Sequence, residues 1–208
     1  MKKLLENKTL VAVCGVIAIV VISALTFLQG RAAYNPAHRY EQLRADLANG
    51  DFRAANTEAS EITLVLANRT NEGWLGKDDV ENLPCADIIY MDRLFAEASG
   101  GKFGLSAQRE VLDALLETTP DGVLLSSAPE TLVAFGEAVG WRRDGEWLTY
   151  DAMSFSPDDA PKGHLPVFKP EDKIRAPFKS RNGRPQTGGA LYDLLTHRLD
   201  ACQPGLSG

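Results

Sequence analysis

The feature that most constrains this chain is an uncharged apolar run near its N-terminus, from Leu10 to Leu28. The run contains no proline, and as a helix it would span roughly 28 Å, close to the hydrocarbon thickness of a bilayer. A cleaved signal peptide would have a shorter apolar region and then a small-x-small cleavage site, which Phe27 to Arg31 do not provide. The sequence therefore predicts an uncleaved transmembrane anchor over residues 10–29.

The charges that flank this run predict its orientation. Three lysines and one glutamate precede it, whereas the nearby positive charges that follow are Arg31 and Arg39. The bias favours a cytoplasmic N-terminus, residues 1–9, in a single-pass protein of the cell membrane whose main domain lies on the outer or lumenal side. That placement would allow a disulfide between Cys85 and Cys202, although two buried free thiols are an equal alternative.

Composition argues against several classes of function. A net charge of -6 disfavours nucleic-acid binding, which needs a basic face to displace counterions from phosphate. The three histidines and three cysteines show no CxxC or HxxxH spacing, so no bound metal ion is expected. No serine lies in a nucleophile elbow, and Cys85 has no local activating cation. We therefore expect a protein that is not an enzyme.

The rest of the chain has the apolar spacing of a mainly α-helical domain, residues 38–202. Asp51 is placed to cap a helix that starts at Phe52, and Pro84 suits a first helical turn. Asp144 and Gly145 predict one small β-hairpin. Residues 154–189, rich in proline, glycine and basic residues, predict a long loop. The predicted helices are approximately 40–48, 52–66, 84–98, 106–117, 132–139 and 191–199.

Four segments of this domain, taken in order, resemble the signature blocks of the genomes-uncoupled-four family. They are Glu81-Asn82-Leu83-Pro84-Cys85, Ser99 to Ser106 with Gln108, Val139-Gly140-Trp141-Arg142, and Ala160-Pro161-Lys162-Gly163-His164-Leu165-Pro166. The resemblance covers roughly Arg39 to Pro166, with a weaker echo from Leu191 to Cys202.

This resemblance implies a compact, cupped helical domain whose concave apolar face and two flanking loops hold a porphyrin. Members of the family bind protoporphyrin or magnesium protoporphyrin, some bind bilins, and they stimulate magnesium chelatase in chlorophyll biosynthesis. A porphyrin is a wide apolar disc with two propionates, so its site needs an apolar or aromatic floor and cations at the rim. A tetrapyrrole is therefore the expected ligand and a chelatase subunit a possible partner.

The candidate floor consists of five apolar residues: Trp74, Leu83, Phe103, Leu105 and Phe155. Ordinary core packing is the alternative for each of them. It applies most to Phe103 and Leu105, and less to Trp74 and Phe155, whose surroundings are polar or proline-rich.

The candidate rim lies in the loop after Pro166, where basic residues cluster in an otherwise acidic chain. Arg175 and Arg181 are the predicted propionate contacts, because a guanidinium can pair with a carboxylate through two hydrogen bonds. A solvated basic loop is the alternative. His164 could ligate a metalloporphyrin, but a lone histidine before Leu-Pro more often hydrogen-bonds loop backbone.

Two hypotheses for function follow. In the first, the chain is a membrane-anchored tetrapyrrole-binding protein that acts as a carrier, sensor or regulator of tetrapyrrole metabolism. In the second, it is an envelope interaction or sensor module whose fold receives a protein partner. An outer location would keep the domain from a cytoplasmic chelatase.

Overall fold

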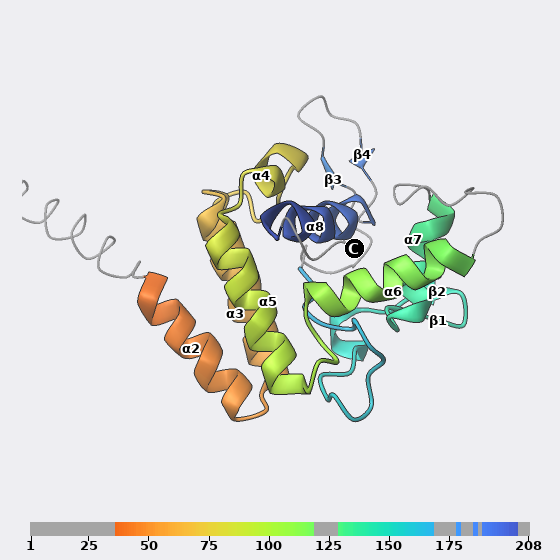
Figure 1. The fold of residues 1–208 in the computed structure, drawn as a ribbon, viewed down its shortest axis with the longest axis horizontal. Coiled ribbons are helices and arrows are strands. Elements are labelled where there is room, and N and C mark those ends of the chain that lie inside the picture. The colour runs from red at the N-terminus through yellow and green to blue at the C-terminus, as the bar shows by residue number, and fades with distance from the viewer. Residues whose placement is uncertain (1–35, 119–128, 169–177, 180–184, 187–188, 204–208) are drawn as a thin grey trace, which may run out of the picture. The chain divides into compact units, whose positions relative to one another are not determined.

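The computed structural model describes residues 36–118, 129–168, 178–179, 185–186 and 189–203. Contacts divide the chain into a unit that ends at Tyr40 and a second unit from Glu41 onward. The described part is mainly helical (Figure 1). Among these residues no helix is long and apolar enough to cross a membrane. The predicted anchor over residues 10–29 lies outside the described residues and stays a prediction.

The first two predicted helices, approximately 40–48 and 52–66, are confirmed. Helix α2, Pro36–Ala48, ends before Asn49, and helix α3, Phe52–Leu66, follows. Asp51 caps α3, since its side chain accepts a hydrogen bond from Ala54 N at 3.0 Å. The apolar face of α3 lies in the core, and the ring of Phe52 meets Phe103 edge to face at 5.3 Å.

Helices α5, Cys85–Ser99, and α6, Leu105–Thr118, form the next pair. Pro84 is the N-cap residue of α5, where its missing N–H costs nothing. Gly100 ends α5 in the left-handed conformation. The carboxylate of Asp92 then caps α6 from the side, accepting hydrogen bonds from Ser106 N at 2.9 Å and Ser106 Oγ at 3.0 Å.

The hairpin predicted about Asp144 and Gly145 is also confirmed. Helix α7, Pro129–Ala138, precedes strands β1, Arg142–Arg143, and β2, Glu146–Trp147, which pair antiparallel. A 3₁₀ turn, η2, covers Tyr150–Ala152.

One helix and one pair of strands were not predicted. Helix α4, Lys77–Glu81, is too short for a helical period to be visible in its sequence. Strands β3, Phe178–Lys179, and β4, Pro185–Gln186, pair antiparallel within the predicted loop. Two-residue strands, one of which starts with proline, have no alternating pattern that could have been detected.

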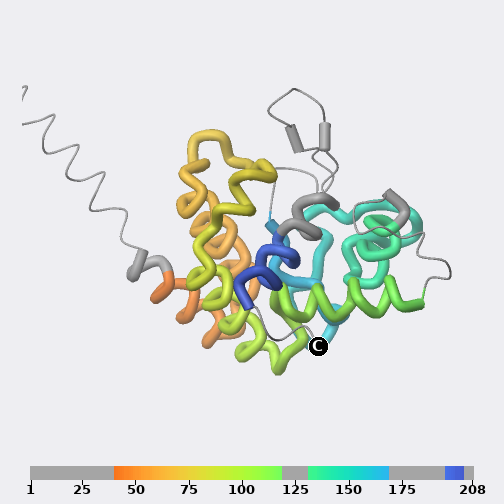
Figure 2. The backbone as a smooth tube through the Cα atoms, turned by 45° about the horizontal axis from the view of Figure 1, so that its top comes forward, coloured from red at the N-terminus to blue at the C-terminus, as the bar shows by residue number. Residues whose placement is uncertain are grey.

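The terminal helix α8, Gly189–Cys202, is longer than predicted and closes the domain. It contacts α4, α5 and α6. In Figure 2 its blue C-terminal part lies between the yellow-green α5 and the green α6. Cys202 forms a disulfide with Cys85, with their Cα atoms 5.2 Å apart, which settles the alternative left open by the sequence. Arg198 Nε and Nη2 donate to the carbonyl of Leu83 at 2.9 and 2.6 Å, next to this disulfide.

Candidate ligand-binding site

The second and third signature blocks converge on the segment that contains the fourth, residues 160–168, in which residues 160 and 163–168 are buried. Gly104 N donates to the carbonyl of Leu165 at 2.9 Å, and Gly163 N donates to the carbonyl of Lys102 at 2.9 Å. These two bonds join the turn after α5 to the Pro-rich segment. Because the two blocks are about 60 residues apart in sequence, their pairing ties α5 and α6 to the loop that follows η2.

Two buried amide side chains hold the end of this segment. Gln108 Nε2 donates to the carbonyl of Pro166 at 2.8 Å. Asn56 pairs twice with Val167, since its Oδ1 accepts from Val167 N at 2.7 Å and its Nδ2 donates to Val167 O at 2.9 Å. Both amides are 0% exposed, so each satisfies backbone groups that water cannot reach. Phe168 is the last described residue of this segment.

Trp141 and His164 complete the arrangement. Trp141 is fully buried, and its Nε1 donates to the carbonyl of His164 at 2.8 Å. His164 Nδ1 lies 2.6 Å from the carbonyl of Val139 and must carry the proton, because a carbonyl can only accept. The prediction that His164 hydrogen-bonds loop backbone is confirmed. Burial lowers the pKa of His164, against the raising effect of the Val139 carbonyl.

Close backbone contact explains one glycine of the third block. Gly140 has φ of +76°, and a Cβ there would lie 2.7 Å from Pro161 Cγ. A larger residue would separate the third block from the fourth. We call the buried converging residues, Asn56, Gln108, Trp141, His164 and Val167, the buried frame. Gly140 and the exposed Pro161 border it.

Three of the five predicted floor residues lie in the protein core. Leu83, Phe103 and Leu105 are at most 1% exposed. The core-packing alternative describes their positions, and they present almost no surface to a ligand in this structure. Their predicted contact with a ligand is not otherwise tested.

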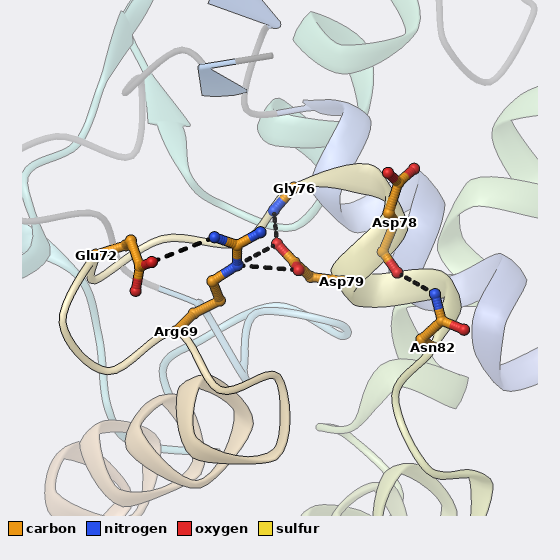
Figure 3. A network of polar contacts seen from close by, with 6 residues as sticks. All are labelled: Arg69, Glu72, Gly76, Asp78, Asp79 and Asn82. Atoms are coloured by element: carbon orange, nitrogen blue, oxygen red, sulfur yellow. Dashed lines mark hydrogen bonds and ion pairs between the residues drawn. The ribbon is translucent and has the colours of Figure 1, made fainter. Parts of the chain in front are cut away.

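Trp74 lies in the loop between α3 and α4 and is half-buried. The guanidinium carbon of Arg69 is 5.8 Å from the centre of its ring. Arg69 Nε donates to both carboxylate oxygens of Asp79 at 3.0 Å, and Arg69 Nη1 donates to Glu72 Oε1 at 3.3 Å (Figure 3). Asp79 also accepts from Gly76 N at 2.7 Å, which fixes the start of α4. We call Arg69, Glu72, Trp74, Gly76 and Asp79 the α3–α4 rim.

Phe155 lies near the opposite end of α3. The guanidinium carbon of Arg53, the second residue of α3, is 4.2 Å from its ring centre, and Tyr150 meets it at 5.0 Å. Arg53 is in the first turn of α3 and Arg69 follows its C-terminal end, and the 15 residues of this helix span roughly 22 Å. The structure therefore does not bring Trp74 and Phe155 together, and one macrocycle would not contact both.

The two predicted rim arginines, Arg175 and Arg181, lie outside the described residues. Their segment starts after Phe168, which is 5% exposed and follows the buried frame. The helix that follows it, α8, contacts α4. The described residues on both sides of the segment thus belong to the helical domain.

The polar residues that the sequence interpretation missed are Asn56, Arg69 and Arg198. Asn56 carried a detectable signal, because it lies on the apolar face of α3 between Ala55 and Ala59, where a polar side chain needs a partner. Arg69 and Arg198 carried none, since a charged residue beside a loop or on a helix normally indicates solvent. Within the described ranges, no group of three histidine, cysteine or acidic residues could hold a metal ion.

The fold is that of solved GUN4 proteins. The structure of GUN4 from Chlamydomonas reinhardtii matches with a TM-score of 0.53 at 25% identity, over 76% of this chain and 87% of that one. The ligand-free structure of Arabidopsis thaliana GUN4 matches with a TM-score of 0.52 at 19% identity, over 77% and 92%.

A family model described as GUN4-like matches residues 34–177, well over half of the chain. This chain belongs to the GUN4-like family, which confirms the resemblance seen in the four blocks. The uncharacterized protein ycf53 of Pyropia yezoensis is 28% identical over 62% of the chain, and the Ycf53-like protein of Synechocystis is 27% identical over 62%. The chain spans about half the length of these relatives, 50% and 51%.

Proposed function

We propose that this chain binds a tetrapyrrole and acts without catalysis, as a carrier, sensor or regulator of tetrapyrrole metabolism held at a membrane. The ligand would be protoporphyrin, magnesium protoporphyrin or a bilin. The observation that carries the proposal is membership of the GUN4-like family over residues 34–177, with the fold of solved GUN4 proteins. The chemistry of the α3–α4 rim supports it, because an aromatic ring beside a guanidinium suits a flat ligand with carboxylates.

In this proposal the ligand contacts the α3–α4 rim. Trp74 supplies an aromatic surface that is half-buried, unlike the core residues Phe103 and Leu105. The sequence-based prediction that Arg175 and Arg181 contact the propionates is kept as part of this proposal, and both residues lie outside the described residues.

The location of the domain is a second part of the proposal. The predicted anchor over residues 10–29 would leave residues 1–9 in the cytoplasm and the domain on the outer or lumenal side. The disulfide between Cys85 and Cys202 supports that side, because disulfides persist in oxidising compartments and are rare in the cytoplasm. A magnesium chelatase subunit would be a partner only if it met the domain on that side of the membrane.

Counting thiols in cells tests this location. After rapid denaturation without reductant, we expect a maleimide–polyethylene glycol to label one of the three cysteines, Cys14, and all three after reduction. Three labels without reductant would place the domain in a reducing compartment. A Cys85→Ser and Cys202→Ser double variant, which should take one label under both conditions, is the control.

Porphyrin titration tests the binding function. The full chain in lipid nanodiscs is titrated with protoporphyrin, with empty nanodiscs as the blank. The matched variants are Trp74→Leu and Trp147→Leu, because Trp147 is also half-buried and also lies near a guanidinium, that of Arg142 at 5.3 Å. Loss of a stacking ring should weaken binding about tenfold for Trp74→Leu, from a stacking contribution of about 1 to 1.5 kcal/mol, and leave Trp147→Leu unchanged.

Absence of saturable binding by the unsubstituted chain at micromolar protoporphyrin would contradict the proposed function and favour the interaction module. Equal losses in the two variants would remove Trp74 from the site while leaving binding itself established.

A further inference from the structure

One edge of the Arg69 guanidinium is held in place by a fixed carboxylate. Arg69 Nε lies 3.0 Å from both oxygens of Asp79, whose Oδ2 also accepts from Gly76 N at 2.7 Å (Figure 3). The Asp79 side chain is 13% exposed and belongs to the first turn of α4. Because Asp79 is bound from two directions, this pair orients the guanidinium and limits its freedom to change rotamer.

The other edge is occupied only loosely. Arg69 Nη1 contacts a single oxygen of Glu72 at 3.3 Å, and the Glu72 side chain is 41% exposed. Exposed ion pairs of this kind contribute little to stability, because water solvates both partners well. Among the described residues Arg69 Nη2 has no hydrogen-bond partner. The outer edge of the guanidinium can therefore bind a different carboxylate with little loss of free energy from the broken pair with Glu72.

Trp74 determines what kind of carboxylate that would be. Its ring centre lies 5.8 Å from the guanidinium carbon of Arg69. A flat ligand resting on the exposed part of this ring would have its own edge beside the guanidinium. An acid attached to the edge of an aromatic or conjugated ring would then meet both groups at once.

We propose that Arg69 recognises a carboxylate on the periphery of the ligand, which replaces Glu72 while the pair with Asp79 stays intact. This inference rests on the proposed function and adds to it that the ligand must carry a free acid at its Trp74 end. Arg69 is then a specificity-determining residue, and Glu72 a carboxylate that competes with the ligand.

The test compares protoporphyrin with its dimethyl ester, which keeps the macrocycle and lacks the free acids. Both are titrated against the full chain in nanodiscs and against Arg69→Gln. Removing one charge-assisted contact should weaken binding of the acid about tenfold or more and leave the ester within about twofold. Glu72→Gln should strengthen binding of the acid about two- to threefold, because it removes the competing carboxylate.

The matched control is Arg142→Gln, since Arg142 lies beside Trp147 and pairs with Glu137 at 2.7 Å, away from the α3–α4 rim. Arg142→Gln should leave the affinity for both protoporphyrin and its dimethyl ester unchanged. Arg69→Gln also removes a partner of Asp79 and could loosen α4, but loosening would weaken acid and ester alike. The ratio of the two affinities therefore isolates the carboxylate contact.

Equal losses of acid and ester in Arg69→Gln would overturn this inference. Failure of the unsubstituted chain to bind either ligand would instead contradict the proposed function, so the two failures are distinguishable.

Discussion

The buried frame and the α3–α4 rim use polar side chains in opposite ways. In the frame, Asn56 and Gln108 are fully buried, and both bond to backbone groups of one segment. In the rim, Arg69 and Glu72 are partly exposed and bond mainly to other side chains. The frame contains residues of the signature blocks, whereas the rim contains none of them.

This difference separates the residues that identify the family from those that would recognise a ligand. A buried polar group that loses its partner costs about 1 to 3 kcal/mol, so residues of the frame are constrained by folding itself. An exposed ion pair is worth about 0 to 1 kcal/mol, so residues of the rim can change without loss of the fold. Motifs alone therefore locate the scaffold more securely than the site.

The largest expected effect comes from truncating Trp141 in the frame. Trp141→Ala removes a fully buried indole and its hydrogen bond to the carbonyl of His164, and should lower the free energy of unfolding by about 3 to 5 kcal/mol. Trp74→Ala removes a half-buried ring from the rim and should cost less than about 1 kcal/mol. Urea denaturation of the two variants measures both values.

Similar decreases in the free energy of unfolding of the two variants would contradict this difference, because they would show that the rim stabilises the fold as much as the frame does. A loss near zero for Trp141→Ala would show that the frame is dispensable.

A smaller effect concerns pH and His164. Burial lowers the pKa of His164 in the folded protein below its unfolded value of about 6.5. The unfolded chain therefore binds the proton more readily, so stability is full above about pH 6.5 and is lost as the pH falls toward the folded pKa. The slope contributed by one such group is at most about 1.4 kcal/mol per pH unit.

His164→Asn keeps a donor for the carbonyl of Val139 and removes the titration, so stability should depend less on pH between 7 and 5, whatever its absolute value. Burial raises the pKa of Asp92, which changes stability in the opposite sense, but Asp92 is common to both proteins. Unfolding free energies measured across this range give the two slopes. Parallel slopes would mean that His164 is solvated, contrary to its place in the frame.

Much of the fold could be predicted from short-range signals. Helices α2 and α3 followed from apolar spacing and from Asp51, and the β-hairpin followed from Asp144 and Gly145. These signals involve residues within a few positions of one another. Over so short a distance, the spacing of apolar residues predicts which of them share a face of a helix or strand. Helix α4 and the β3–β4 pair escaped prediction because they are shorter than any period that a pattern needs.

The site could be predicted less well, because spacing cannot distinguish an apolar residue in the core from one in a ligand-binding floor. Leu83, Phe103 and Leu105 are in the core, and Phe155 lies at the far end of α3 from Trp74. Arg69 could not be predicted as a site residue, because only the folded position of α4 brings Asp79 within hydrogen-bonding distance of it. This contact depends on the path of the loop between α3 and α4, and no local sequence pattern predicts that path.

By itself the sequence determined the family, the mainly helical class and most helix boundaries, because these follow from blocks and periods that a single chain carries in order. The tertiary structure alone decided that Cys85 meets Cys202, that Asn56 supports Val167, and that Trp74 and Phe155 lie apart. The physical reason is distance along the chain. Contacts between residues a hundred positions apart are chosen by the packing of the whole domain, in which most buried polar groups find a partner.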